Sequence, residues 1–83
     1  MIKRKLTLQM DGRLDQKKIA QLVEIMSKFQ SRITLEHENT KANVKSMMGM
    51  LSLDIVGGDE ISITADGPDE YRAMERIKQL LSE

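Results

Sequence analysis

The sequence predicts a two-layer α+β domain, an open sandwich in which three helices cover one face of a four-stranded antiparallel sheet. Two hydrophobic periods predict it: alternation in some segments, typical of strands, and spacing of three or four residues in others, typical of helices. In chain order the segments read strand, helix, strand, strand, helix, strand, helix. The length of 83 residues suits one small domain, assigned to residues 1–83. Apolar faces of this kind bury one another in two layers.

The first strand and the first long helix are predicted from a change of period. Residues 2–10 alternate between apolar and polar side chains, and Asp11-Gly12 is a turn signal. Helical spacing then predicts a helix over about residues 16–28, with Asp15 at the N-cap position. The inward faces are expected to be Ile2, Leu6, Leu8 and Met10 for the strand, and Ile19, Leu22, Val23, Met26 and Phe29 for the helix.

A hairpin is predicted next. Residues 32–38 alternate again, and Asn39-Thr40 is interpreted as the turn to a short return strand. The only histidine, His37, shares its face with Ile33 and Leu35. No second metal ligand lies at a recognised spacing from it, so we expect a partly buried strand residue and no metal site.

A short helix from Met47 to about Leu53 is predicted behind a serine cap at Ser46. So short a helix cannot bury every apolar residue, and some of Met47, Met48 and Met50 should face water. Flexible methionine side chains on a surface suit a docking patch. A phosphate on Ser46 would be favoured at the positive end of the helix. A plainer interpretation stays open, in which Ser46 only caps the helix and the methionines fill the core.

The last strand and helix follow a Gly57-Gly58 turn. Residues 60–65 alternate cleanly and predict a strand. Pro68 is expected at the first helical position, with Asp69 and Glu70 in the first turn. The predicted buried stripe of this helix is Tyr71, Met74, Ile77 and Leu81, with Ala73 and Leu80 beside it.

Composition excludes several classes of function. The 13 basic and 13 acidic residues cancel, so no net charge draws nucleic acid or an anionic membrane. The absence of cysteine excludes disulfides, thiolate catalysis and cysteine zinc sites. With one Phe, one Tyr and no Trp, aromatic stacking of bases is also excluded.

Targeting and catalytic signals are missing as well. Apolar runs stay far below the ~20 residues of a membrane helix, and the N-terminus lacks the apolar region of a signal peptide. These features predict a cytoplasmic protein. Nothing supplies a nucleophile–base pair or a phosphate-cradling glycine loop, so we expect no enzymatic activity and no cofactor.

Several short segments, together with the order of elements, carry a resemblance that covers essentially the whole chain. It resembles the HPr family, the histidine-containing phosphocarriers of the bacterial sugar phosphotransferase system, and this implies an HPr-like fold. The most specific segment, Asn43 to Leu53, resembles the regulatory serine segment of HPr and of its relative Crh in Gram-positive bacteria. The other segments are Ser-Lys-Phe at 27–29, Ile-Thr-Leu-Glu at 33–36 and Ile-Ser-Ile-Thr-Ala at 61–65.

The resemblance implies a modification site and its partners. Ser46 matches the serine that an ATP-dependent HPr kinase/phosphorylase modifies. In that group the phosphorylated protein acts as corepressor for the catabolite control protein CcpA, a transcription factor. The implied partner-binding residues of this chain are Asp15, Lys17, Met47, Met48, Met50 and Leu51.

The segment before the first long helix departs from the family pattern. HPr proteins carry Gly-Leu-His-Ala-Arg-Pro there, and the histidine takes phosphate from Enzyme I. This chain has Arg-Leu-Asp-Gln-Lys-Lys at 13–18, which puts Asp15 at the phosphoacceptor position. Lys17 replaces an arginine that Crh keeps, and lysine lacks the bidentate fork. We interpret Asp15 as a helix cap and expect the histidine phosphorelay to be lost.

The leading hypothesis is therefore a regulatory protein of the phosphotransferase system and carbon catabolite repression, which acts by protein–protein contacts at the Ser46 segment. One alternative is a carrier in a specialised phosphotransferase branch that takes phosphate from Enzyme I on Asp15 as an acyl phosphate. Another is a structural or self-associating interaction module. In each case we expect protein partners, no direct contact with nucleic acid or membrane, and a monomer or weak homodimer.

Overall fold

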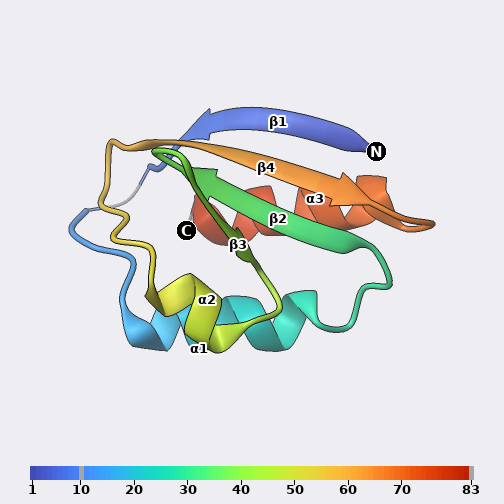
Figure 1. Ribbon diagram of the computed structural model, residues 1–83, viewed down its shortest axis with the longest axis horizontal. Helices are drawn as coiled ribbons and strands as arrows, with labels where there is room; N and C mark the ends of the chain where they lie inside the picture. Colours follow the sequence, from blue (N-terminus) through green and yellow to red (C-terminus); the bar gives the residue numbers. More distant parts are fainter. Residues whose placement is uncertain (10, 83) are drawn as a thin grey trace.

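The computed structural model describes residues 1–9 and 11–82. Within these ranges the helices and strands follow the predicted order (Figure 1). They are β1 (Ile2–Thr7), α1 (Gln16–Met26), β2 (Arg32–His37), β3 (Thr40–Asn43), α2 (Met47–Leu51), β4 (Glu60–Asp66) and α3 (Glu70–Leu81).

The strands form one antiparallel sheet in the order β1-β4-β2-β3, so β1 and β3 are its two edges. Burial alternates along the central strands. Ile33, Leu35 and His37 are buried on β2, whereas the residues between them are half-buried. Side chains at every second position share a face, and the sheet therefore has one apolar face and one polar face.

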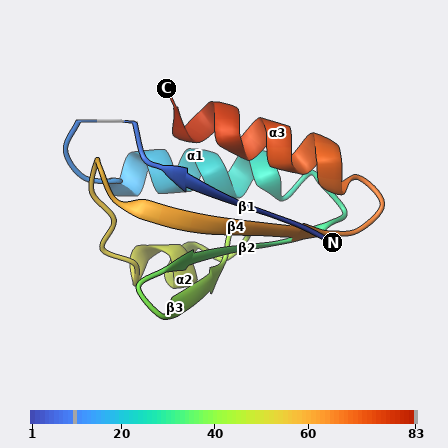
Figure 2. The same ribbon diagram turned by 90° about the horizontal axis from the view of Figure 1, so that it is seen from above.

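The helices supply the second layer. α1 and α3 lie side by side along the sheet, and α2 packs beside α1 next to β3 (Figure 2). Each fully buried Leu, Ile or Met side chain stabilises the fold by about 1.5–3 kcal/mol, so these contacts dominate the packing energy. The buried side chains of the helices are Ile19, Leu22 and Met26 on α1, Met50 on α2, and Ala73, Met74, Ile77, Leu80 and Leu81 on α3. The predicted fold class is confirmed.

Two turns and helix ends differ from the prediction. The hairpin turn is centred on Glu38 and Asn39, whose φ angles are 53° and 69°, and His37 pairs with Thr40. Two successive positive φ angles are the signature of a type I′ turn, which matches the twist of a two-residue hairpin, so the predicted Asn39-Thr40 turn is off by one residue. α1 and α2 both end two residues earlier than predicted. Each ends at a C-cap serine, Ser27 for α1 and Ser52 for α2.

The start and inner face of α3 also need correction. Asp69, not Pro68, borders the helix, which begins at Glu70. Tyr71 was expected in the buried stripe but is 67% exposed, while Ala73 and Leu80 are fully buried. Met10, predicted on the inner face of the first strand, lies outside the described residues. No helix in the described ranges is long and apolar enough to span a bilayer.

Candidate functional site

Ser46 caps the short helix α2. Its backbone is extended (φ −108°, ψ 114°), and its hydroxyl oxygen accepts a hydrogen bond from the Gly49 N–H at 3.2 Å. Capping of this kind satisfies one of the backbone donors that a helix start leaves free. Ser46 as a whole is half-buried.

The methionine segment after Ser46 divides between surface and core. Met48 is 83% exposed and Leu51 is 46% exposed, whereas Met47 is half-buried against the core. Met50, predicted as a partner-binding residue, is fully buried. The prediction for Met50 is wrong in this respect, because a helix that packs on α1 and β3 must turn one side chain per turn inward. The exposed apolar side chains of this segment are therefore Met48 and Leu51, and together with Ser46 we name them the Ser46 patch.

Asn43 and Lys45, which the sequence analysis did not single out as site residues, make the hydrogen bonds of the segment that leads to Ser46. The side-chain oxygen of Asn43 accepts from Lys45 N at 2.9 Å, and the Asn43 carbonyl accepts from Ser46 N at 2.9 Å. The Lys45 ammonium group donates to the carbonyl of Phe29, beyond the end of α1. Asparagine commonly makes such local turns, and this signal was available in the sequence; the long-range lysine contact was not.

Asp15 is the N-cap of α1, as predicted. One carboxylate oxygen accepts from Lys18 N at 2.9 Å, and the Asp15 carbonyl accepts from Ile19 N at 2.9 Å. The Asp15 side chain is exposed, and Lys17 is exposed on the first turn of the same helix. Asp15 therefore stabilises the start of α1 at the position that was considered for a phosphoacceptor.

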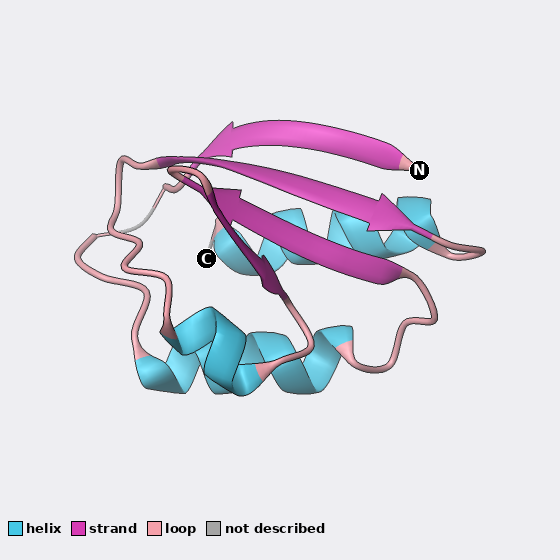
Figure 3. Ribbon diagram, in the orientation of Figure 1, coloured by secondary structure: helices cyan, strands magenta, loops and turns pink. Residues whose placement is uncertain are grey.

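The segment before α1 and the loop after α2 are joined directly. Leu14 N donates to the Ile55 carbonyl at 2.9 Å, and Gly57 N donates to the Gly12 carbonyl at 2.6 Å. In Figure 3 these two loops run together at one end of the molecule. α1 and α2 also contact each other. The structure thus places the Asp15 and Ser46 segments on neighbouring helices, although the hydrogen bonds of the two side chains go to their own helices.

His37 has a structural partner. Its Nε2 lies 3.0 Å from Oδ2 of Asp59, and the same oxygen accepts from Val56 N at 3.0 Å. His37 was expected to be partly buried; it is buried, and it connects the hairpin to the loop before β4. Within residues 1–9 and 11–82, no group of three His, Asp or Glu side chains could hold a metal ion.

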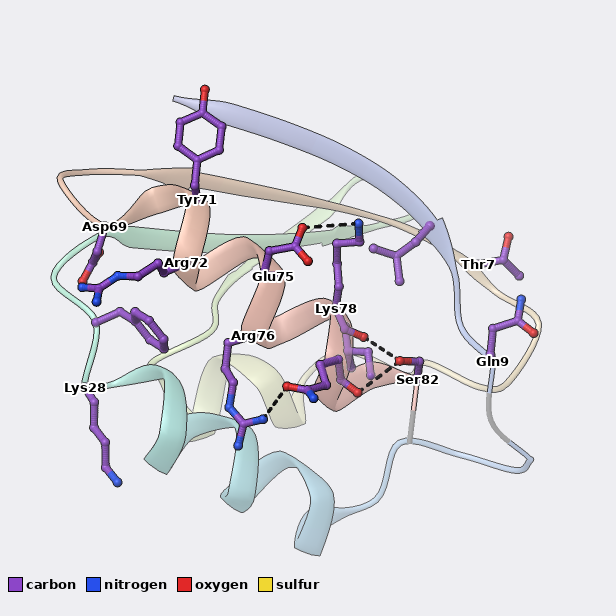
Figure 4. A pocket seen from close by; sticks show the side chains of 14 residues that line it. Thr7, Gln9, Lys28, Asp69, Tyr71, Arg72, Glu75, Arg76, Lys78 and Ser82 are labelled. Atoms are coloured by element: carbon purple, nitrogen blue, oxygen red, sulfur yellow. Dashed lines mark hydrogen bonds and ion pairs between the residues drawn. The ribbon is translucent and has the colours of Figure 1, made fainter.

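A surface hollow lies away from these residues. It measures about 1020 Å³ and borders β1, α3 and the segment after α1 (Figure 4). None of the predicted site residues lines it. A smaller hollow of about 450 Å³ borders His37 and Asp59.

Comparisons with known proteins agree with this geometry. Residues 2–83 match the family model described as "PTS HPr component phosphorylation site". The chain is 38% identical over 80 residues to phosphocarrier protein HPr of Xylella fastidiosa, covering 96% of this chain and 90% of that protein. It is 31% identical over 83 residues to HPr-like protein Crh of Bacillus subtilis, covering 100% and 98% of the two chains.

A solved structure of an HPr protein has the same fold as this chain. The crystal structure of HPr-C-His from Thermoanaerobacter tengcongensis superposes with a TM-score of 0.90 at 32% identity, covering 98% of this chain and 91% of that chain. The sequence match spans nearly the whole chain, and the superposition includes both the sheet and the helices that carry Asp15 and Ser46. The chain belongs to the HPr family of phosphotransferase-system proteins.

Proposed function

We propose that this HPr-family protein is a cytoplasmic regulator of the phosphotransferase system and carbon catabolite repression, and that its histidine phosphocarrier activity is lost. One observation carries the proposal. The half-buried Ser46 is followed by two exposed apolar side chains, Met48 and Leu51, and an aspartate caps α1 where the sequence resemblance matches the family's histidine.

The chemistry of the Ser46 patch supports a phosphorylation switch. A phosphate on Ser46 would add a charge of about −1.5 to −2 at pH 7 directly beside the apolar surface of Met48 and Leu51. A partner that buries these two side chains would then also have to accommodate that charge. A regulator with basic residues opposite the phosphate gains affinity, whereas a partner that presents an apolar or acidic surface loses it.

Incubation with ATP and HPr kinase/phosphorylase, read by intact mass, tests the modification. We expect one phosphoryl group on the wild type and none on Ser46→Ala. An unmodified wild-type protein would contradict this half of the proposal.

Binding of a CcpA-type regulator tests the docking half. We expect the phosphorylated protein to bind more tightly than the unmodified one, and Met48→Ala to weaken that binding. Tyr71→Ala is the matched control, since it also truncates an exposed large side chain but on α3. If Met48→Ala and Tyr71→Ala lost the same amount of affinity for the regulator, docking at the Ser46 patch would be contradicted.

A second candidate is a phosphocarrier that uses Asp15. The exposed carboxylate and the 38% identity to a phosphocarrier HPr favour it. Against it, one carboxylate oxygen already caps α1, and a full negative charge repels the phosphoryl donor. Phosphoenolpyruvate with Enzyme I, followed by hydroxylamine trapping, distinguishes the two: we expect no acyl phosphate. Asp15→Asn is the control, because an amide keeps the cap and removes the nucleophilic carboxylate.

A further inference from the structure

The strand β1 has a free edge. Within the described ranges it pairs with β4 alone. Leu8 N donates to the Asp59 carbonyl at 2.9 Å, on the β4 side. Because backbone groups along an antiparallel strand point alternately to its two sides, those of Lys3, Lys5 and Thr7 point to the free edge. The guanidinium of Arg4 already donates to the Lys3 carbonyl at 2.9 Å, so this carbonyl is within reach of donors other than β4.

This edge carries three consecutive basic residues. Lys3, Arg4 and Lys5 are exposed, and their cross-strand neighbours are Thr64, Ile63 and Ser62, none of them acidic. In the part of the chain that the structure describes, none of the three forms an ion pair. The three basic residues are consecutive in a chain whose formal net charge is zero.

The hollow of about 1020 Å³ borders the same strand. In Figure 4, Thr7 and Gln9 lie on its β1 side, and Tyr71, Glu75, Lys78 and Ser82 follow one another along α3. Leu6 contributes apolar surface to the lining. The exposed Tyr71 ring stands at one end, and Lys78 pairs only loosely with Glu75, at 3.9 Å. Side chains from a strand added at the edge would find room and apolar contact here.

We propose that the free edge of β1 and the hollow beside it bind an extended acidic segment of another protein, which adds a fifth strand to the sheet. Main-chain hydrogen bonds to Lys3, Lys5 and Thr7 would supply affinity. Alternate side chains of the added segment would point into the hollow. Those between them would place carboxylates beside Lys3 and Lys5.

Charge disfavours a second copy of this chain as the occupant. Antiparallel pairing of two β1 strands about Arg4 sets Arg4 against Arg4 and Lys3 against Lys5. Like charges directly opposite each other destabilise a strand pair. Basic edge residues are also a common defence against unwanted sheet extension, and an acidic strand is the one class of strand that this defence attracts.

The proposal is independent of the proposed function, because the Ser46 patch lies by β3, at the opposite edge of the sheet. That opposite edge also offers the matched control. β3 is shorter, Thr40–Asn43, and Lys41 is its only basic residue. The Lys41→Glu variant therefore changes charge on an edge strand without touching β1.

A labelled peptide of alternating valine and glutamate, seven residues long and blocked at both ends, is the probe, and fluorescence anisotropy is the measurement. A valine–lysine peptide of the same length tests charge. A valine–glutamate peptide N-methylated at every second residue tests main-chain pairing. Circular dichroism confirms that each protein variant is folded.

We expect the acidic peptide to bind and the basic and N-methylated peptides to bind more weakly. The double variant Lys3→Glu with Lys5→Glu should lose about tenfold in affinity, because two favourable cross-strand pairs become unfavourable. Lys41→Glu should change the affinity little. Absent binding, equal binding of the basic peptide, or full affinity after N-methylation would overturn the proposal. So would self-association of the wild-type protein that the double variant abolishes.

Discussion

Asp69, at the start of α3, binds Ser31, which lies 38 positions earlier in the chain and just before β2. Its Oδ1 accepts a hydrogen bond from Ser31 N at 2.9 Å and a second from the Ser31 hydroxyl at 2.5 Å. Its Oδ2 accepts from Gln30 N at 2.9 Å. These donors, led by the Ser31 hydroxyl, lower the pKa of Asp69 to about 2 from an ordinary 3.8. The carboxylate therefore belongs to the loop before β2 as much as to its own helix.

Acid should weaken this connection. Asp69 has a lower pKa in the folded state than in the unfolded chain, so its contribution to stability is complete above about pH 4 and is lost as the pH falls toward 2. Urea unfolding at pH 7, 4 and 2 should show a decline in wild-type stability that is reduced in Asp69→Asn. Glu24→Gln, on the exposed face of α1, is the control and should retain the wild-type decline.

Gly67 permits the close approach of the same loop. Its φ is 156°, and a Cβ there would lie 2.6 Å from Ser31 Cα, closer than backbone and side chain can pack. We expect Gly67→Ala to lower the free energy of unfolding by about 1–3 kcal/mol or more. Gly58→Ala has an unfavourable φ of 92° but open space around the added methyl group, and should cost less in the same denaturation experiment. A smaller loss at Gly67 than at Gly58 would contradict the packing argument.

Truncating Met50 and truncating Met48 should change the free energy of unfolding by different amounts, because one side chain is buried and the other is exposed. Met50→Ala removes a fully buried side chain and should lower the free energy of unfolding by about 2–5 kcal/mol. Met48→Ala removes an 83% exposed side chain and should stay within about 0.5 kcal/mol of the wild type. Thermal or urea unfolding measures both. Similar effects from the two variants would mean that α2 is oriented differently on α1.

The buried histidine should depend on its acidic partner. Asp59→Ala removes the group that contacts His37 Nε2 and accepts from Val56 N, and should cost about 1–3 kcal/mol, because the buried imidazole then loses its partner. Asp54→Ala is the matched control on the same loop. Its ion pair with Arg13 is exposed on both sides and should be worth no more than about 1 kcal/mol. Equal losses would show that the loop, and not the histidine contact, carries the effect.

Local patterns predicted much of the candidate site. Asp15 and Ser46 could be identified as helix caps, since a cap depends on one side chain and the backbone within three residues of it. The exposure of Met47, Met48 and Met50 could not be divided among them. On a five-residue helix the apolar run fits several orientations, and only packing on α1 and β3 selects one. The contact of Lys45 with the carbonyl of Phe29 joins residues 16 positions apart, which no local pattern records.

The sequence by itself determined the order of helices and strands and most of the inward faces, because hydrophobic period is a property of a few neighbouring residues. The tertiary structure alone decided the strand order, the free and charged edge of β1, the exposure of Tyr71 and the reach of Asp69 to Ser31. Each of these depends on which distant segments become neighbours. That choice is made by the packing of the whole core and not by any single stretch of the chain.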